Sequence, residues 1–253
     1  MSGHYIGVVL HGRGGLARLA SPSKQIALIV SDIIGDPIEL IASGPTFISN
    51  KKNIDILNVI VANNTMILKD LSLHLNSAGF IPIIHSMTVD ISNFLAEELK
   101  LKINISPINI IKNNKIVLLF GGESTVCFDE NKVSPEAKGG RNQEIVLSLL
   151  NELLELKDGE LKQIFEGFEF AFSSLGTDGQ DGPTDAAGAF ICSNYFLNKS
   201  TEQLSFLSKN VKLALNSKCS YQFWNEFNNG KNIVKTGKTG MNVMDIQMLV
   251  IKL

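Results

Sequence analysis

The sequence predicts an α/β protein with a largely parallel sheet, or sheets, flanked by helices. Three observations support this prediction: short apolar runs recur along the chain, segments of helical periodicity lie between them, and several runs end in glycine-rich, acidic loops. In such sheets, ligands bind in the crevice at the carboxyl ends of the strands. We therefore look for function in the loops that follow the apolar runs.

Six apolar runs are predicted to be buried strands, because each is rich in β-formers and too short for a helix. They cover residues 24–32, 56–64, 80–86, 115–123, 168–176 and 244–253. No internal repeat or low-complexity tract interrupts them. The polar stretch over residues 47–55 is the best candidate for a domain boundary.

Three segments have helical periodicity and are predicted to cover the sheet in Rossmann-like layers. They span residues 64–79, 142–156 and 220–227. In the first, Leu68, Leu71 and Leu75 fall on one face, Asn64 is placed to cap the start, and Gly79 is placed to end the helix.

Composition limits the classes of function. The 253 residues are 44% hydrophobic and 19% charged, which is typical of a globular chain with a sizeable core. The formal charge is −2, from 25 acidic and 23 basic residues, so no long-range field favours nucleic acid or an anionic membrane. We predict neither partner, and any anion must be bound locally.

Cysteine usage and hydropathy predict the compartment. The three cysteines are widely spaced and include no C-x-x-C pair, which argues against a disulfide framework or zinc knuckle and favours a reducing compartment. The longest apolar runs are too short to span a membrane, and residues 1–15 lack a basic leading segment. We predict a soluble, cytoplasmic protein, with a mitochondrial location as the alternative.

The predicted strand ends carry the chemistry. Four polar, glycine-bearing loops should share one sheet edge: "SDIIGDPIELIASGPT", "GGESTV", "LGTDGQDGPTDAAGA" and "KTGKTGMNVMD". Glycine lets backbone amides approach an anion. The aspartates of these loops are out of place unless a cation or a proton transfer is involved, and Mg²⁺ can bridge carboxylates and phosphate. Arg141, at the start of a predicted helix, is placed to clamp a carboxylate or phosphate.

Three competing motifs fail. "NIVKTGKT" imitates a phosphate-binding loop, but Asn232 stands where glycine is required, and a strand follows instead of a helix. "DGQDGPTDAAGA" imitates a calcium loop, but Gln180 occupies a ligand position and no bidentate glutamate follows. The histidines, His4, His11, His74 and His85, have no metal-ligand spacing.

Taken together, five blocks resemble one family. "SDIIGDPIELIASGPT", "GGESTV", "GGRNQE", "GTDGQDGPTDAAGA" and "TGMNVMD" are similar, in this order, to signature blocks of the class II glycerate kinases, whose C-terminal portion is called the MOFRL domain. The resemblance runs from about Gly14 to the end of the chain. It implies ATP- and Mg²⁺-dependent phosphorylation of D-glycerate to 2-phosphoglycerate, in a cleft between two α/β domains.

The resemblance also implies a domain division. Residues 1–52 are expected to be a remnant of the N-terminal kinase domain, and residues 53–253 the C-terminal α/β region, with the MOFRL domain at about 113–253. Family members carry a longer N-terminal half, with a glycine-rich loop and a lysine thought to act in catalysis, so the chain is interpreted as truncated. An apolar patch is expected near residues 3–12, and homo-oligomers are possible. The alternative to a kinase is a non-catalytic fragment or a regulatory or partner subunit that retains the fold.

Roles in the implied reaction can be assigned to individual residues. Arg141 is expected to hold negative charge on substrate or phosphate, and Asp36 or Asp32 to orient or deprotonate the glycerate hydroxyl. Asp178 and Asp181 are expected to position Mg²⁺ directly or through water. Substrate or nucleotide binding is expected from Ser43, Gly44, Gly121, Gly122, Glu123, Gly140, Asn142, Thr177, Lys238 and Asn242, the assignments of Lys238 and Asn242 resting mainly on the resemblance.

Simpler interpretations of the same residues remain open. Asp32 and Asp36 would equally suit local caps, and Arg141 a solvent-exposed position at a helix start. Asp178 and Asp181 would equally stabilise the tight turn "GTDGQDG".

Overall fold

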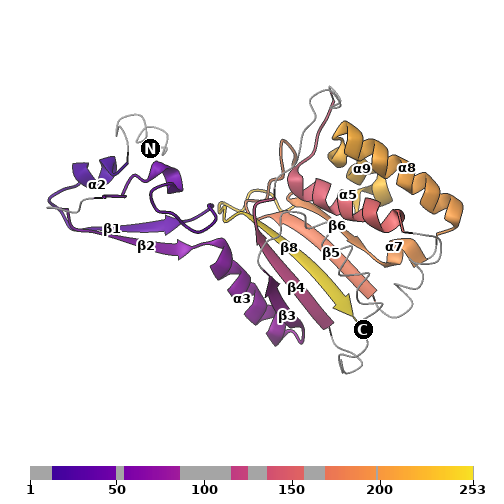
Figure 1. Cartoon of the computed structure of the whole chain (residues 1–253), viewed down its shortest axis with the longest axis horizontal. Helices are drawn as coiled ribbons and strands as arrows, with labels where there is room; N and C mark the ends of the chain where they lie inside the picture. The colour runs from indigo at the N-terminus through magenta and orange to yellow at the C-terminus, as the bar shows by residue number, and fades with distance from the viewer. Residues whose placement is uncertain are drawn as a thin grey trace.

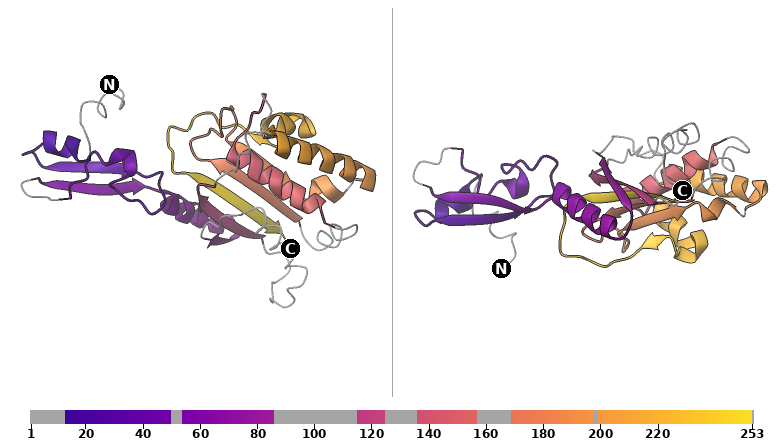
Figure 2. Two further views of the ribbon diagram at one scale, coloured as in Figure 1. Left: turned by 45° about the horizontal axis from the view of Figure 1, so that its top comes forward. Right: turned by 90° about the horizontal axis from the view of Figure 1, so that it is seen from below.

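A computed structural model describes residues 13–49, 54–85, 115–124, 136–156, 169–197 and 199–252. The apolar patch predicted near residues 3–12, and residues 50–53 of the predicted boundary, lie outside these ranges. Two sheets lie at opposite ends of an elongated molecule, and helix α3 (Asn64–Ser77) runs between them (Figure 1, Figure 2).

The smaller sheet holds two strands, β1 (Gln25–Val30) and β2 (Ile56–Ala62), which pair in parallel. Helix α2 (Gly15–Leu19) and the 3₁₀ turn η1 (Ile41–Ser43) accompany it. Its core is small, and three buried residues form it: Ala17, Ile48 and Ile56. The predicted burial of β1 on both faces is therefore wrong, because alternate residues of β1 are exposed.

The larger sheet holds six strands in the order β3-β4-β8-β5-β6-β7. Their bounds are β3 (Ile81–His85), β4 (Lys115–Gly122), β5 (Glu169–Gly176), β6 (Gly188–Cys192), β7 (Ile233–Val234) and β8 (Asp245–Lys252). The α/β class with flanking helices is confirmed, but the expectation of largely parallel pairing needs correction. In this sheet only β3 and β4 pair in parallel, while the other four pairs are antiparallel. The antiparallel direction of β6 and β8 was not predicted. Both strands begin at the edge where β5 ends, so they run back along β5 and need no helical crossover.

Helices cover both faces of the larger sheet, as the alternation along β4 requires. Leu118 and Phe120 face a core shared with α5, whereas Val117 and Leu119 face Leu68 of α3. Beyond α5 lie α8 and α9, which pack against it (Figure 1). The bounds are α5 (Arg141–Leu154), α7 (Asn194–Leu197), α8 (Thr201–Ser217), α9 (Ser220–Glu226) and the 3₁₀ turn η2 (Phe227–Gly230).

All six predicted strands and all three predicted helices are present. One detail needs correction: Asn63, not Asn64, caps α3, because its backbone is extended and its side chain accepts a hydrogen bond from Met66 N. Strand β6 and helix α8 were not predicted. None of the helices in the described ranges is long and apolar enough to cross a membrane.

Candidate functional site

Several strand ends meet at one edge of the larger sheet. Strands β4 and β5 flank β8 and run antiparallel to it, so their carboxyl ends lie beside its first residue. In the register, Asp245 pairs with Gly122 on one side and Gly176 on the other. Three of the four glycine-bearing loops therefore converge at one edge, as predicted, although the sheet is mixed. The fourth loop follows β1 in the smaller sheet, so the prediction of a single shared sheet is wrong for it.

The carboxyl ends of β1 and β2 point toward this same edge (Figure 1). Asn64, at the start of α3, donates from Nδ2 to the carbonyls of Val243 and Asp245, at 2.8 and 3.0 Å. Its side chain fits because Gly121 has no Cβ: an added one would lie 1.8 Å from Asn64 Oδ1. This contact fixes the start of α3 against the first residue of β8.

Arg141, the first residue of α5, stands at the centre of the edge. Its Nε and Nη2 donate to Asp245 Oδ2 and Oδ1, at 2.5 and 3.1 Å, and its Nη1 donates to Glu123 Oε1 at 2.5 Å. The Asp245 side chain is only 1% exposed, whereas that of Glu123 is 48% exposed. The guanidinium is therefore held from its buried side, and one edge of it reaches solvent.

The two partners of this pair have perturbed pKa values. Partial burial acts to lower the pKa of Arg141, but hydrogen bonding to Asp245 and the charges of nearby carboxylates raise it overall. Burial raises the pKa of Asp245, and this outweighs the hydrogen bonds from Arg141 and Asn142, which lower it. The pair therefore favours the cationic form of Arg141, whereas burial disfavours the charged form of the Asp245 carboxyl group.

Asp181 organises the start of α5. Its Oδ1 accepts from Asn142 N, its Oδ2 accepts from Gln143 N, and both side-chain amides donate to it as well. The carboxylate thereby satisfies two of the backbone N–H groups left open at a helix start. Gly140 allows this approach, because a Cβ there would lie 2.3 Å from Asp181 Cγ.

Asn142 links the two buried carboxylates. Its Nδ2 donates to Asp181 Oδ1 at 3.2 Å and to Asp245 Oδ1 at 3.1 Å, and its Oδ1 accepts from Ser174 Oγ. Asn142 is itself buried, so it supports the network that holds Arg141 from within.

The loop after β5 contains Asp178 and Asp181, which the sequence predicts to position Mg²⁺. Asp178 Oδ1 accepts from Gln180 N, as in a local turn, and Asp178 is half-buried. Among the residues that the structure describes, no group of three or more His, Cys, Asp or Glu side chains could hold a metal ion. Both carboxylate oxygens of Asp181 accept hydrogen bonds from α5, so Asp178 is the less engaged of the two predicted Mg²⁺ ligands, and the metal assignment of both stays a prediction.

Thr177 and Asn242 join the loops around β8. Thr177 Oγ1 donates to the Met244 carbonyl at 2.6 Å and accepts from Val243 N, while Asn242 Oδ1 accepts from Met244 N. Both side chains therefore shape the approach to β8. Lys238 is exposed in the same loop.

The remaining predicted residues lie toward the smaller sheet. Asp36 Oδ2 accepts from Asn63 Nδ2 at 2.5 Å, and its backbone φ is +54°, an uncommon value for a residue with a side chain. Asp32 is exposed. Gly44 accepts a hydrogen bond from Gly14 N and lies against Glu39, and Ser43 precedes it, so this pair builds the small unit itself.

Asp245 was missed as a site residue. From the block "TGMNVMD" the sequence predicts a binding role for Asn242 alone, and Asp245 falls only within the predicted strand 244–253. A signal was available, because an acidic residue that opens an otherwise apolar strand must be paired if it is buried.

The fold and the edge define a mixed α/β domain with a buried carboxylate network around one arginine. Known families match most of this chain. The MOFRL family matches residues 116–245, and a domain of unknown function, DUF4147, matches residues 10–75. The chain belongs to the MOFRL family.

Several known proteins are similar to this chain over most of its length. An uncharacterized Caenorhabditis elegans protein is 36% identical, the glycerate kinase of Danio rerio 30% and the D-glycerate 2-kinase of Thermotoga maritima 28%. These matches cover 94%, 94% and 92% of this chain, and 59%, 60% and 58% of the relatives. The crystal structure of glycerate kinase from Thermotoga maritima aligns with a TM-score of 0.72 at 25% identity, over 95% of this chain and 60% of that one.

The resemblance to the glycerate kinases is therefore confirmed. The chain spans about 60% of the length of the relatives that it matches. The domain division proposed above, at residues 52/53, is not tested by these matches and stays a prediction.

Proposed function

We propose that the protein acts in the phosphorylation of D-glycerate to 2-phosphoglycerate, with ATP as the phosphoryl donor. The observation that carries this proposal is the placement of Arg141 at the meeting point of the strand ends. Three of its five N–H donors bind Asp245 and Glu123. Two remain, which is the number needed to clamp a carboxylate or phosphate through two parallel bonds.

The chemistry of phosphoryl transfer suits such an edge. The reaction depends on positioning and on stabilising the negative charge of the transferred group. Arg141 would supply a compensating positive charge, because a guanidinium stays protonated over the whole physiological range. Arg141 would bind either the glycerate carboxylate or the transferring phosphate.

The acceptor hydroxyl requires a group that orients it or removes its proton. We propose Asp36 for this role, because its carboxylate is held by Asn63 Nδ2 at 2.5 Å on the strand-end loop of β1. Asp32 is the nearby alternative. Mg²⁺, when bound, would neutralise charge on the nucleotide phosphates, with Asp178 as its protein ligand.

A non-catalytic role is the second candidate. The chain spans about 60% of the glycerate kinases that it matches, so a part of their machinery could be supplied elsewhere. The protein would then bind a ligand or a complementary chain without turning over alone. We also retain as proposals the reducing cytoplasmic compartment and formation of a homo-oligomer.

A coupled ADP-release assay with the purified protein, ATP, Mg²⁺ and D-glycerate separates these functions. We expect glycerate-dependent ADP release, loss of it in Arg141→Ala, and retention in the matched control Arg18→Ala, on helix α2. Phosphorus NMR of the product identifies the phosphorylated hydroxyl. ADP release absent from a folded wild-type protein that still binds 2-phosphoglycerate calorimetrically supports the non-catalytic candidate.

A further inference from the structure

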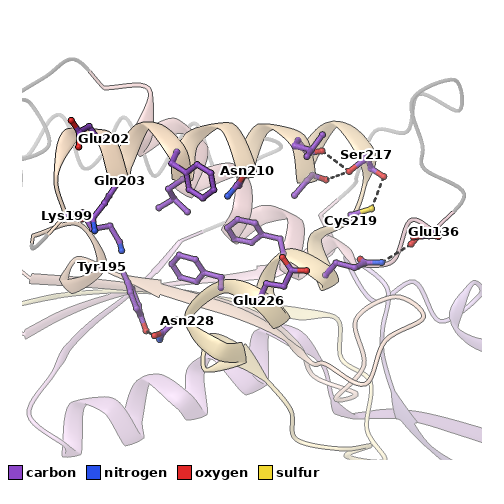
Figure 3. Close-up of a pocket in the computed structure, with 17 residues that line it drawn as sticks. Glu136, Tyr195, Lys199, Glu202, Gln203, Asn210, Ser217, Cys219, Glu226 and Asn228 are labelled. Atoms are coloured by element: carbon purple, nitrogen blue, oxygen red, sulfur yellow. Dashed lines mark hydrogen bonds between the residues drawn. The ribbon is translucent and has the colours of Figure 1, made fainter.

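A cavity of about 880 Å³ lies away from the strand-edge site, between α8 and the α9–η2 segment (Figure 3). Figure 3 shows Lys199, Glu202 and Gln203 at one end, and Ser217, Cys219 and Glu136 at the other. None of the residues assigned to the proposed reaction lines it. The cavity is thus a separate feature of the helical layer, which we call the α8–α9 groove.

The α8 wall of the α8–α9 groove has the periodicity of a helix-packing surface. On α8 the lining positions recur every three or four residues: Gln203, Phe206, Asn210, Leu213 and Ser217, with Glu202, Leu207 and Ala214 beside them. This spacing is that of a seam between packed helices. At 1.5 Å per residue, the stripe from Gln203 to Ser217 is about 21 Å long, which is about four helical turns.

The α8–α9 groove exposes apolar side chains. Phe206 and Leu213 are each 68% exposed, and they project from the α8 wall seven residues apart. Across from them, the rings of Phe223 and Phe227 stack with centroids 5.5 Å apart. Apolar surface of this kind, rimmed by polar residues, is typical of interaction sites.

The rim of the α8–α9 groove is acidic. Three carboxylates line it, those of Glu136, Glu202 and Glu226, against the single ammonium of Lys199. Within the described ranges, Glu202 and Glu226 form no ion pair, and both are exposed. An occupant that carries positive charge beside its apolar surface would therefore match the rim.

These features select one class of occupant. A small-molecule site usually has a few polar groups that converge inside an enclosed pocket, whereas the polar groups here lie along an elongated rim. A second copy bound by two-fold symmetry would bring the same acidic rim against itself. We propose that the α8–α9 groove binds an amphipathic helix of a partner protein, with an apolar face and flanking lysines or arginines.

The test uses a synthetic 18-residue amphipathic peptide of leucine and lysine, labelled with a fluorophore, and fluorescence anisotropy of the wild-type protein. We expect saturable binding that weakens at least tenfold in the double variant Phe206→Glu, Leu213→Glu. The matched control is Leu73→Glu on α3, where the leucine is equally exposed at 67% but lies outside the groove. Circular dichroism verifies that each variant is folded.

A charge exchange tests the acidic rim. The double variant Glu202→Lys, Glu226→Lys should lose binding of the lysine peptide and gain binding of a matched peptide in which glutamate replaces lysine.

Three outcomes would overturn the proposal. Two of them are equal peptide binding by the wild type and the Phe206→Glu, Leu213→Glu variant, and no peptide binding by the wild type. Sedimentation that shows a wild-type dimer converted to monomer by the Phe206/Leu213 variant assigns the groove to a second copy and overturns it as well.

Discussion

The guanidinium of Arg141 binds the buried carboxylate of Asp245 through two hydrogen bonds, of 2.5 and 3.1 Å, although the two residues lie 104 positions apart in the chain. Asp245 opens the central strand β8, and Arg141 opens α5. The contact therefore ties the start of the helix that covers the sheet to the strand at its centre. It also fixes the direction in which the remaining donors of Arg141 point.

Neutralising Asp245 should separate stability from ligand binding. Because burial already disfavours the charged form of Asp245, we expect Asp245→Asn to leave the free energy of unfolding unchanged or slightly raised at neutral pH. Arg141 would lose its anchor, and affinity for 2-phosphoglycerate should fall about tenfold, a loss of about 1.4 kcal/mol. Urea unfolding and calorimetric titration measure the two effects. Glu123→Gln, at an exposed partner of Arg141, is the control and should weaken binding less.

The raised pKa of Asp245 makes its contribution to stability depend on pH. A carboxyl group whose pKa is raised in the folded state binds protons more tightly there, so its contribution is complete below its unfolded pKa and is lost as the pH rises through its folded pKa. The window therefore lies above the ordinary value of 3.8. We expect the difference in unfolding free energy between wild type and Asp245→Asn to decrease as the pH is raised through this window. A difference that instead grows with pH would show that Arg141 outweighs burial.

Asp181 should matter to stability more than to metal binding. Asp181→Asn would place an amide where four N–H donors converge, and we expect a loss of about 1–3 kcal/mol of unfolding free energy. Asp178→Asn is the control, because its carboxylate accepts one local bond and the change should cost less. Equal melting temperatures for the two variants would contradict the capping role.

Gly121 should resist enlargement for a reason of packing. In Gly121→Ala the new methyl group would lie 1.8 Å from Asn64 Oδ1 and 2.6 Å from Leu68 Cδ1, so Asn64 must leave its contacts with β8. We expect a loss of about 1–3 kcal/mol in urea unfolding. Gly79→Ala meets no atom within 4 Å and tests only the backbone effect of a φ of +84°. The first variant should lose more stability than the second.

The exposed face of the smaller sheet should promote self-association. Ile26, Leu28 and Val30 of β1 lie beside Leu57 and Val61 of β2, and all five are exposed. A contiguous apolar face of this kind favours association. We expect concentration-dependent oligomers in analytical ultracentrifugation, reduced by Leu28→Lys. A wild-type protein that stays monomeric at high concentration would contradict the prediction that this face promotes self-association.

The sequence by itself determined the local structure and the place of the loops. Periodicity and β-rich composition were sufficient for all six predicted strands and for three helices, because these signals depend on neighbours in the chain. Glycine and aspartate after the apolar runs were sufficient to place three of the loops at one edge of the larger sheet. Five signature blocks were sufficient for the family.

The tertiary structure decided the direction of the strands and the partners of the charges. Antiparallel placement of β8 between β4 and β5 depends on contacts between distant segments, which local periodicity does not encode. The same placement buries Asp245 beside Arg141 and leaves Asp181 to cap α5. A carboxylate's role depends on which donors surround it, and for these two residues the donors come from positions far along the chain.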